Sequence, residues 1–245
     1  MKTLLGENFH SYSVALSKEE EIAEWNWTRH KVNLVAHELS QLAPLRRLAD
    51  IGCRNGREAE HYGKSVGAAE IHGFEIAEAP LQIAAGRGIV THRWVSGEEP
   101  CPVADGFFDV IVAGDIIEHL YDTDVFLAEL RRVLVPNGHL IVTTPNLAWW
   151  WNRLRFLAGR LPAGTGPVSP TIVGDSAIDL KHLRVSVASE WRHLFQKSGF
   201  ECVSVQGFRY PIPLSLPLGI LLDRLATRIP SLAHSLLFVL KAAKG

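Results

Sequence analysis

The stretch Arg46–Glu75, RRLADIGCRNGREAEHYGKSVGAAEIHGFE, reads as a strand, a glycine turn, a helix and a second strand. The first apolar run ends at Gly52, residues 57–63 have helical character, and Glu75 closes a second apolar run. In a parallel strand–helix–strand unit, both strands end at the edge of the sheet where ligands bind. Glycine there lets the backbone approach a ligand, and the start of the helix favours an anionic group. An acid about 20 residues further on suits a ribose diol.

The glycine spacing separates two kinds of nucleotide-like ligand. A dinucleotide fingerprint needs glycine at the first, third and sixth positions, but counting from Gly52 puts Arg54 and Arg57 at the last two. The pattern Asp-x-Gly-x-Gly-x-Gly fits better, because Asp50, Gly52 and Gly56 match it and only Arg54 departs from it. At this point the chain resembles the class I S-adenosylmethionine-dependent methyltransferases. An ordinary turn in another doubly wound protein is the alternative interpretation.

Composition bounds the other possibilities. Hydrophobic residues make up 47% of the 245 residues, which is enough to fill the core of one domain with appendages. Lys and Arg number 25 against 26 Asp and Glu, a balance that does not support a nucleic-acid partner. The three cysteines show no metal-ligand or disulfide spacing and fit a reducing cytoplasm, and Cys53 reads as a small packed residue. With no signal peptide and no uncharged run of about 18 residues, we expect a soluble protein.

The rest of the chain alternates between helical and extended patterns. We expect helices at 17–41, 77–87, 124–134, 147–160 and 186–197, and further strands at 94–96, 108–112, 139–144, 200–206 and 236–240. This order predicts an α/β fold: a doubly wound, mostly parallel, seven-stranded Rossmann-like sheet. We expect a single domain, 1–245, comprising a helical cap at 1–44, a cofactor-binding core at 45–207 with a mobile loop at 161–180, and an apolar insertion with the last strand at 208–245.

The second half of the chain sharpens the resemblance. It carries, in order, Gly106-Phe107-Phe108-Asp109, Ile117-Glu118-His119, a helix ending in Pro136-x-Gly138, Pro145-Asn146, and His182-Leu183-Arg184. This order is similar to that of the ubiquinone-type and sugar-modifying O-methyltransferases, over about residues 46–207. The resemblance implies S-adenosylmethionine as cofactor and O-methylation of a sugar or phenolic acceptor, either a small molecule or lipid-linked. N- or C-methylation, a binding module without catalysis, and a dehydrogenase are the alternatives.

The resemblance also implies roles for residues at the cofactor. Glu75 holds both ribose hydroxyls, since a carboxylate accepts two hydrogen bonds, and Ile76 packs on the adenine. Gly97 stands where the family has an acid for the adenine amino group, so the backbone or the carboxylate of Glu98 is expected to serve. The predicted cofactor-binding residues are Asp50, Gly52, Cys53, Gly56, Glu75, Ile76, Gly97, Glu98, Gly114 and Asp115.

His119 is the candidate catalytic base for a hydroxyl acceptor. Its imidazole titrates near neutrality, and it follows the fourth strand at the ligand edge. The alternative is that His119 only packs beside the cofactor. A third interpretation makes Asp115, Glu118 and His119 metal ligands, because Asp-x-x-Glu-His resembles the metal site of ubiquinone-type O-methyltransferases and suits Mg²⁺.

The aromatic and apolar segments of the second half point to the acceptor. Residues 149–151 are three tryptophans with two nearby arginines, which could stack on a ring, lie at a membrane interface or pack in the core. The apolar stretch 210–222 could be a lid, a dimer surface or a membrane-contacting hairpin. A cytoplasmic protein is expected, peripheral membrane contact is one of the alternatives, and the oligomeric state is left open. The predicted acceptor-binding residues are Trp27, Asn146, Trp150, His182 and Arg184, of which the last two could instead cap the next helix.

Overall fold

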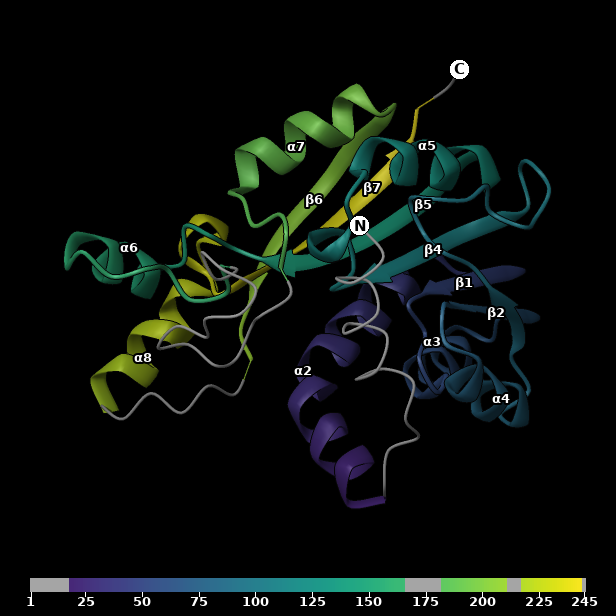
Figure 1. Cartoon of the computed structure of the whole chain (residues 1–245), viewed down its shortest axis with the longest axis horizontal. Coiled ribbons are helices and arrows are strands. Elements are labelled where there is room, and N and C mark those ends of the chain that lie inside the picture. Colours follow the sequence, from purple (N-terminus) through teal and green to yellow (C-terminus); the bar gives the residue numbers. More distant parts are fainter. Residues whose placement is uncertain (1–17, 166–181, 211–216, 244–245) are drawn as a thin grey trace.

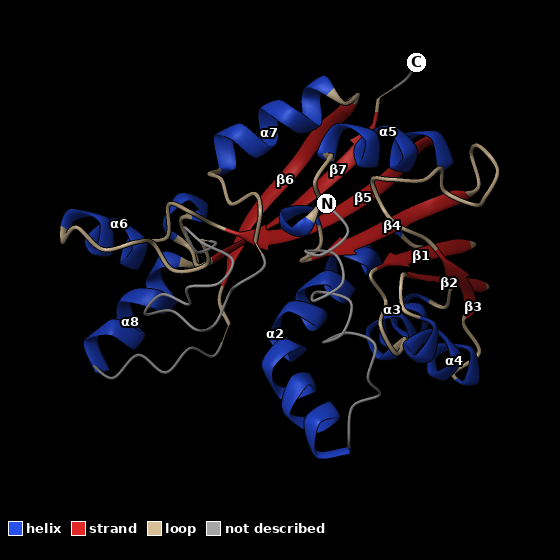
Figure 2. Ribbon diagram, in the orientation of Figure 1, coloured by secondary structure: helices blue, strands red, loops and turns tan. Residues whose placement is uncertain are grey.

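The computed structural model describes residues 18–165, 182–210 and 217–243, and its centre is a seven-stranded sheet (Figures 1 and 2). The strand order is β3-β2-β1-β4-β5-β7-β6. Only β7 runs antiparallel to its neighbours β5 and β6, so the sheet is mixed but mostly parallel. The strands are β1 Arg47–Ile51, β2 Glu70–Glu75, β3 Val90–Arg93, β4 Phe108–Gly114, β5 Leu134–Pro145, β6 Phe200–Phe208 and β7 Ser235–Ala242. The predicted doubly wound α/β sheet is confirmed.

Helices cover both faces of this sheet. Figure 1 shows α5 and α7 on one face and α2, α3 and α4 on the other, with α6 and α8 beyond one end of the strands. The described helices are α2 Lys18–Leu42, α3 Arg57–Val66, α4 Glu78–Gly86, α5 Thr123–Val133, α6 Trp150–Leu157, α7 Ala188–Lys197 and α8 Pro217–Ala226, with short 3-10 turns η1 Ile117–His119 and η2 Pro230–Leu232.

The central strands separate two hydrophobic clusters because successive side chains of a strand point to opposite faces. In β4, Val110 and Val112 pack in the cluster beneath α2 and α3, whereas Ile111 and Ala113 pack beneath α5 and α7. Parallel strands buried on both faces read as continuous apolar runs, as β4 does. This sandwiching holds the carboxyl ends of β1, β2 and β4 together at one edge, where the predicted ligand residues lie.

Most predicted elements exist, with corrected boundaries. The predicted third strand at 94–96 is wrong, because β3 lies at Val90–Arg93 and Trp94 is a buried ring just beyond it, packed on Phe126. The strand expected at 139–144 begins already at Leu134, and the apolar stretch after β6 contains helix α8. The first residue of the helix expected at 17–41, most of the predicted loop 161–180 and part of the stretch 210–222 lie outside the described residues. Within the described ranges, no helix is both long enough and apolar enough to cross a membrane.

Candidate functional site: the carboxyl edge of the sheet

The glycine turn between β1 and α3 has the left-handed backbone that its sequence implies. Gly52 and Gly56 both have φ 75°, and Arg54, which stands where the family pattern has glycine, also has a positive φ of 49°. A side chain at Gly56 would place its Cβ 2.5 Å from Ile89 Cδ1, so glycine is required there. The amides of Gly52 and Cys53 donate to Phe74 O at 2.8 and 3.0 Å, which ties the turn to the end of β2.

The Glu75 carboxylate is fixed by backbone amides at the end of β2. One oxygen accepts from Ile76 N at 2.7 Å and Ala77 N at 3.2 Å, and the other accepts from Arg54 N at 3.2 Å. Glu75 is 7% exposed, so its orientation is set before any ligand arrives. Each carboxylate oxygen has further acceptor capacity, which a pair of neighbouring hydroxyls could use.

Lys31, on α2, lies at this edge and was missed by sequence reasoning. Its ammonium nitrogen is 3.1 Å from Glu58 Oε2 and 3.2 Å from Asp115 Oδ2, and the residue is 5% exposed. Burial alone lowers the pKa of Lys31, but Glu58, Tyr210 and Asp115 together raise it well above its usual value, so it stays charged. The sequence did contain a pattern that predicts this position. Lys31 stands four residues before the buried Val35, so both side chains lie on the same face of the helix.

Asp115 is held by three elements at the end of β4. Its backbone has φ 54°, Thr143 Oγ1 donates to one carboxylate oxygen at 2.9 Å, and the Tyr210 hydroxyl and Lys31 contact the other. Burial raises the pKa of Asp115, but Lys31 and the two hydroxyl hydrogen bonds outweigh burial and lower it. Asp115 therefore belongs to the group of charges around the glycine turn.

The neighbouring carboxylates oppose ionisation of Asp50 in this group. Burial and the neighbouring Glu58 raise the pKa of Asp50 well above its usual value, Lys31 opposes them, and Glu75 adds to the rise. The Lys31 ammonium pairs with two of the carboxylates at this edge, Glu58 and Asp115, while Asp50 lies close enough to Glu58 and to Glu75 for their charges to repel. A cationic ligand would lower the electrostatic free energy of this edge.

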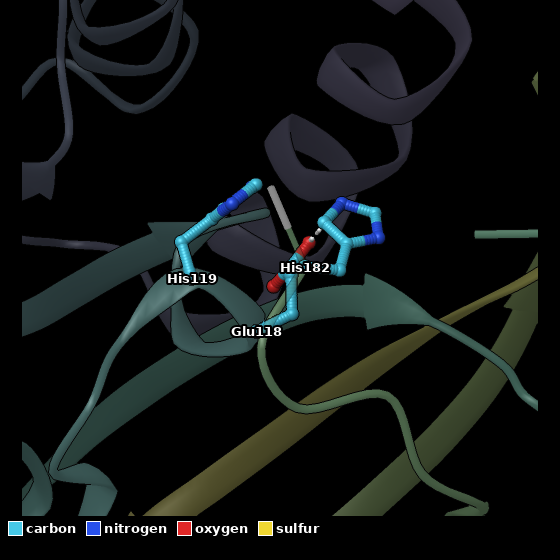
Figure 3. A group of neighbouring side chains, drawn as sticks. All are labelled: Glu118, His119 and His182. Atoms are coloured by element: carbon cyan, nitrogen blue, oxygen red, sulfur yellow. Dashed lines mark ion pairs between the residues drawn. The ribbon is translucent and has the colours of Figure 1, made fainter. Parts of the chain in front are cut away.

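A second group of titratable side chains follows β4, as Figure 3 shows. Glu118, His119 and His182 each have a side-chain donor atom within 4.8 Å of the others. Glu118 Oε1 is 4.0 Å from His182 Nε2, and the two imidazole centroids are 4.7 Å apart. We call these three residues the histidine cluster.

Glu118 organises the histidine cluster through both its main chain and its side chain. Its carbonyl oxygen accepts from Leu183 N at 2.8 Å and Arg184 N at 3.0 Å, which returns the distant segment 182–184 to η1. His182 Nδ1 lies 2.7 Å from Gly164 O, which orients its other nitrogen toward Glu118. The Glu118 carboxylate is fully buried, and neither oxygen has a hydrogen-bond partner among the described residues. Burial and then Asp115 raise the pKa of Glu118 well above its usual value.

The structure groups the predicted metal ligands differently. Glu118 and His119 lie together as expected, but His182 completes the group and Asp115 is bound to Lys31, Thr143 and Tyr210 instead. Sequence spacing could not reveal this, because the segment carrying His182 reaches Glu118 only through the tertiary fold.

Other predicted cofactor residues lie around the glycine turn and the start of α5. Cys53 is buried, its Sγ fills the space where a side chain on Gly73 would stand, and burial raises the pKa of its thiol. Gly97 has φ 82°, and a Cβ there would lie 3.0 Å from Asp122 O. Ile76 follows Glu75 and donates its backbone N–H to the Glu75 carboxylate. The amide of Glu98 donates to Val95 O. Gly114 lies beside Lys31: a Cβ added at Gly114 would be 3.6 Å from Lys31 Nζ.

The predicted acceptor residues do not form one group. Trp27 is 41% exposed and stacks on Tyr210, with ring centroids 5.4 Å apart. Asn146 is buried, and its amide donates to Ala233 O at 2.8 Å and Pro230 O at 3.2 Å. Trp150 donates to Asp223 Oδ1 at 3.2 Å, and Arg184 donates to Tyr121 O at 2.6 Å. Only His182 joins His119.

This geometry agrees with comparisons to known proteins. A family model described as a methyltransferase domain matches residues 25–205, most of the chain. The chain belongs to this methyltransferase family. The resemblance found in the sequence is therefore confirmed, and the match covers α2 through β6, including the glycine turn, Glu75 and the histidine cluster.

Curated relatives of this methyltransferase carry related names. It is 27% identical to a Mycolicibacterium smegmatis protein named as a probable S-adenosylmethionine-dependent methyltransferase, over 76% of this chain and 64% of that protein. It is 31% identical to a ubiquinone biosynthesis O-methyltransferase from Bradyrhizobium, over 57% of each chain. A ubiquinone/menaquinone biosynthesis C-methyltransferase from Paraburkholderia phytofirmans is 29% identical, over 45% of this chain and 47% of that one. The chain thus spans less than two thirds of the length of these relatives.

Solved structures share the fold of this methyltransferase. An S-adenosylmethionine-dependent methyltransferase from Thermotoga maritima superposes with a TM-score of 0.60 and 18% identity, covering 93% of this chain and 96% of that one. The [4+2]-cyclase SpnF superposes with a TM-score of 0.59 and 19% identity, covering 88% and 81%. At these identities the likeness concerns the fold alone.

Proposed function

We propose that this chain binds S-adenosylmethionine and transfers its methyl group to an oxygen of a sugar or phenolic acceptor, either a small molecule or lipid-linked. The observation that carries the proposal is the acidic edge around the glycine turn. Lys31 pairs with Glu58 and Asp115 there, the buried Asp50 lies near Glu58 and Glu75, and the Glu75 carboxylate is held in place by backbone amides. S-adenosylmethionine carries a sulfonium, an ammonium and a ribose diol, all of which this edge complements.

The residues present fit this cofactor. Asp50, Gly52 and Gly56 would hold the methionine half, Glu75 the ribose hydroxyls, and Ile76 the adenine. Lys31 and Asp115 offer opposite charges for the carboxylate and ammonium of an amino acid. When bound, the cofactor supplies an electrophilic methyl group on a sulfonium.

His119 is proposed as the base for the acceptor hydroxyl. It lies on η1 just beyond the cofactor edge, and its partners Glu118 and His182 limit the orientations its ring can adopt. Removing the hydroxyl proton while the oxygen is held in line with the methyl group is the chemistry that this placement supports, because positioning and proton transfer each contribute large rate factors.

A divalent cation at the histidine cluster is a second proposal, favoured by the buried Glu118 carboxylate, which accepts no hydrogen bond from the part of the chain that the structure describes. One carboxylate and two imidazoles suit a transition ion such as Zn²⁺ better than the Mg²⁺ expected from the sequence, because Mg²⁺ prefers oxygen ligands. Held there, the ion would orient an acceptor with adjacent oxygens. Chelator treatment separates the two proposals: loss of activity with recovery on adding metal supports the ion, and unaffected activity supports His119 as the base.

The acceptor atom is part of the proposal as well. Relatives are named for both O- and C-methylation, and one structural neighbour is named as a cyclase, so the fold does not decide the reaction. A base beside the cofactor edge favours oxygen, since a hydroxyl must lose its proton. We also propose a reducing, cytoplasmic setting, in keeping with the free thiols of the buried Cys53 and Cys101.

Calorimetric titration tests the cofactor first. S-adenosylmethionine and S-adenosylhomocysteine are each titrated into the purified protein, with NAD as the control. We expect micromolar binding of the two sulfur ligands and none of NAD, followed by incorporation of labelled methyl into a phenolic or sugar acceptor. Binding of NAD alone would overturn the proposal, and tight cofactor binding without methyl transfer to any acceptor would favour a non-catalytic module.

A further inference from the structure

The exposed apolar side chains of this chain are concentrated at one end. More than half of the large hydrophobic side chains that are exposed in the described part lie on α6, on α8 or just after them. Phe156 and Leu157 are 72% and 83% exposed, and Leu221 is 53% exposed. We call this surface the α6–α8 face; it comprises Leu154, Phe156, Leu157, Leu161, Ile220, Leu221, Leu222, Leu225 and Ile229.

Hydrogen bonds join the inner sides of α6 and α8. The exposed apolar side chains of the α6–α8 face therefore lie on an ordered surface. Trp149 and Trp150 at the start of α6 both donate to Asp223 Oδ1 on α8, at 2.8 and 3.2 Å. Asp223 and Ala226 face inward and are buried, while Leu221 and Leu225, one turn apart, face outward. Arg153 also donates to Ser231 O at 3.1 Å, which fixes α6 to the segment after α8.

Among the described residues of α6, α8 and the segments directly after them, the exposed charged side chains are all basic. Arg153, Arg155 and Arg160 border α6, and Arg224 and Arg228 border α8. Within residues 147–165 and 217–234 the only acid is Asp223, which is 1% exposed, and no described carboxylate pairs with the five arginines. The hydrogen bonds of Arg153 and Arg155 go to backbone carbonyls and leave their charge uncompensated. The whole chain has a net charge of -1, so this basic border is local.

We infer that the α6–α8 face docks on the surface of an anionic lipid bilayer. Apolar side chains ringed by arginines match the acyl boundary and the anionic headgroups of such a surface, and neither helix is long enough to span it. A second copy of the chain is a poorer occupant, because two such faces would bring arginines against arginines, and the described residues of α6, α8 and the segments after them offer no exposed acid. Figures 1 and 2 place α6 and α8 at the end of β5, β6 and β7, which includes the carboxyl edge of β5. Docking is independent of methyl transfer.

Vesicle flotation without cofactor tests this inference. The protein is mixed with vesicles of phosphatidylcholine alone, or of phosphatidylcholine with phosphatidylglycerol, at low and high salt. We expect flotation only with the anionic vesicles, weakened by salt because the arginine contribution is screened. Leu221→Ser with Leu225→Ser should reduce the vesicle-bound fraction on the order of tenfold, since both side chains would leave the acyl boundary. Arg224→Glu with Arg228→Glu should abolish the preference for phosphatidylglycerol.

Matched controls keep the result interpretable. Val90→Ser with Val125→Ser removes two exposed apolar side chains far from the α6–α8 face and should leave flotation unchanged. Thermal melting of every variant checks that the fold is retained. Absence of wild-type flotation with anionic vesicles, or equal flotation of the leucine variant, would overturn the inference. So would a dimer, measured by light scattering, that the leucine variant converts to a monomer without any effect on vesicles.

Discussion

The glycine turn and the histidine cluster lie at the same edge of the sheet but are built in opposite ways. At the turn, the Glu75 carboxylate accepts hydrogen bonds from three backbone amides, all within Arg54–Ala77. In the cluster, the Glu118 carboxylate is buried without a hydrogen-bond partner among the described residues, and its neighbour His182 comes from a distant segment. The difference teaches that one part of the edge is preorganised by local backbone, whereas the other is completed only by the tertiary fold.

Replacing His119 should have the largest effect on activity. It removes one member of the histidine cluster and leaves the glycine turn unchanged. His119→Ala is expected to lower turnover by about 10²–10⁴-fold, the usual contribution of a general base. Affinity for S-adenosylmethionine should stay near that of the wild type, because Glu75 and the glycine turn are untouched. Initial-rate kinetics and calorimetry measure the two effects separately. An active variant would reduce His119 to a packing residue.

Replacing Glu75 breaks the other side of the comparison. Glu75→Ala should weaken cofactor binding by ~1–3 kcal/mol through the lost hydrogen bonds to the diol. Because the carboxylate also accepts from Arg54, Ile76 and Ala77, this variant should melt at a lower temperature as well. Glu75→Gln keeps an acceptor for the amides and is the matched control. Unchanged affinity in both variants, measured by calorimetry, would refute the ribose assignment.

Replacing Asp50 tests the electrostatic repulsion among the carboxylates around the glycine turn, and so sharpens the comparison with the histidine cluster. Asp50→Asn should raise the melting temperature of the ligand-free protein by a few degrees, roughly 1 kcal/mol, and weaken the binding of S-adenosylmethionine. A carboxyl group whose pKa is raised on folding costs stability wherever it is ionised in the unfolded state, and this cost is full only above the raised pKa of the folded state. The gain in the variant should therefore be full above that raised pKa and shrink as the pH falls through it. Melting curves across a pH series measure this, and a gain that grows on acidification would contradict it.

Replacing Trp150 should have the smallest effect and probes the region beyond both groups. Trp150→Phe removes the 3.2 Å hydrogen bond to Asp223 but leaves that of Trp149 in place. We expect a loss of ~0.5–1 kcal/mol of stability, with cofactor affinity unchanged. Trp149→Phe, at a buried position with a 2.8 Å bond, is the comparator and should cost more in denaturant titrations. Equal stability of both variants would mean that Asp223 does not hold α6 to α8.

The same contrast explains what the sequence could predict. The glycine turn and Glu75 lie within one strand–helix–strand unit, so spacing alone placed them, and the alternation of elements predicted the sheet. Lys31 was missed because its helix was interpreted only as a cap, although its position one turn before Val35 placed it on the buried face. His182 was expected near the acceptor, but its contact with Glu118 depends on backbone hydrogen bonds between distant segments, which no local pattern encodes.

Boundary errors had local causes. Trp94 was read as part of a strand because it is large and apolar, but its ring is buried beyond the end of β3 and its N–H donates to Glu99 O. Aromatic residues are common in strands, but the ring of Trp94 packs in the core beyond the strand. The helical character of α8 was hidden by the apolar composition of its surroundings, which gives a weak periodic signal.

The place of β7 in the sheet has a consequence for how the chain assembles. β7 follows every other strand in sequence, yet it lies between β5 and β6 and pairs with both along its length. During synthesis, β6 emerges before β7, the strand with which it pairs in the folded chain. The edge of β5 that β7 covers therefore stays open until residues 235–242 leave the ribosome, whereas β1 and β2, which carry the glycine turn and Glu75, emerge long before.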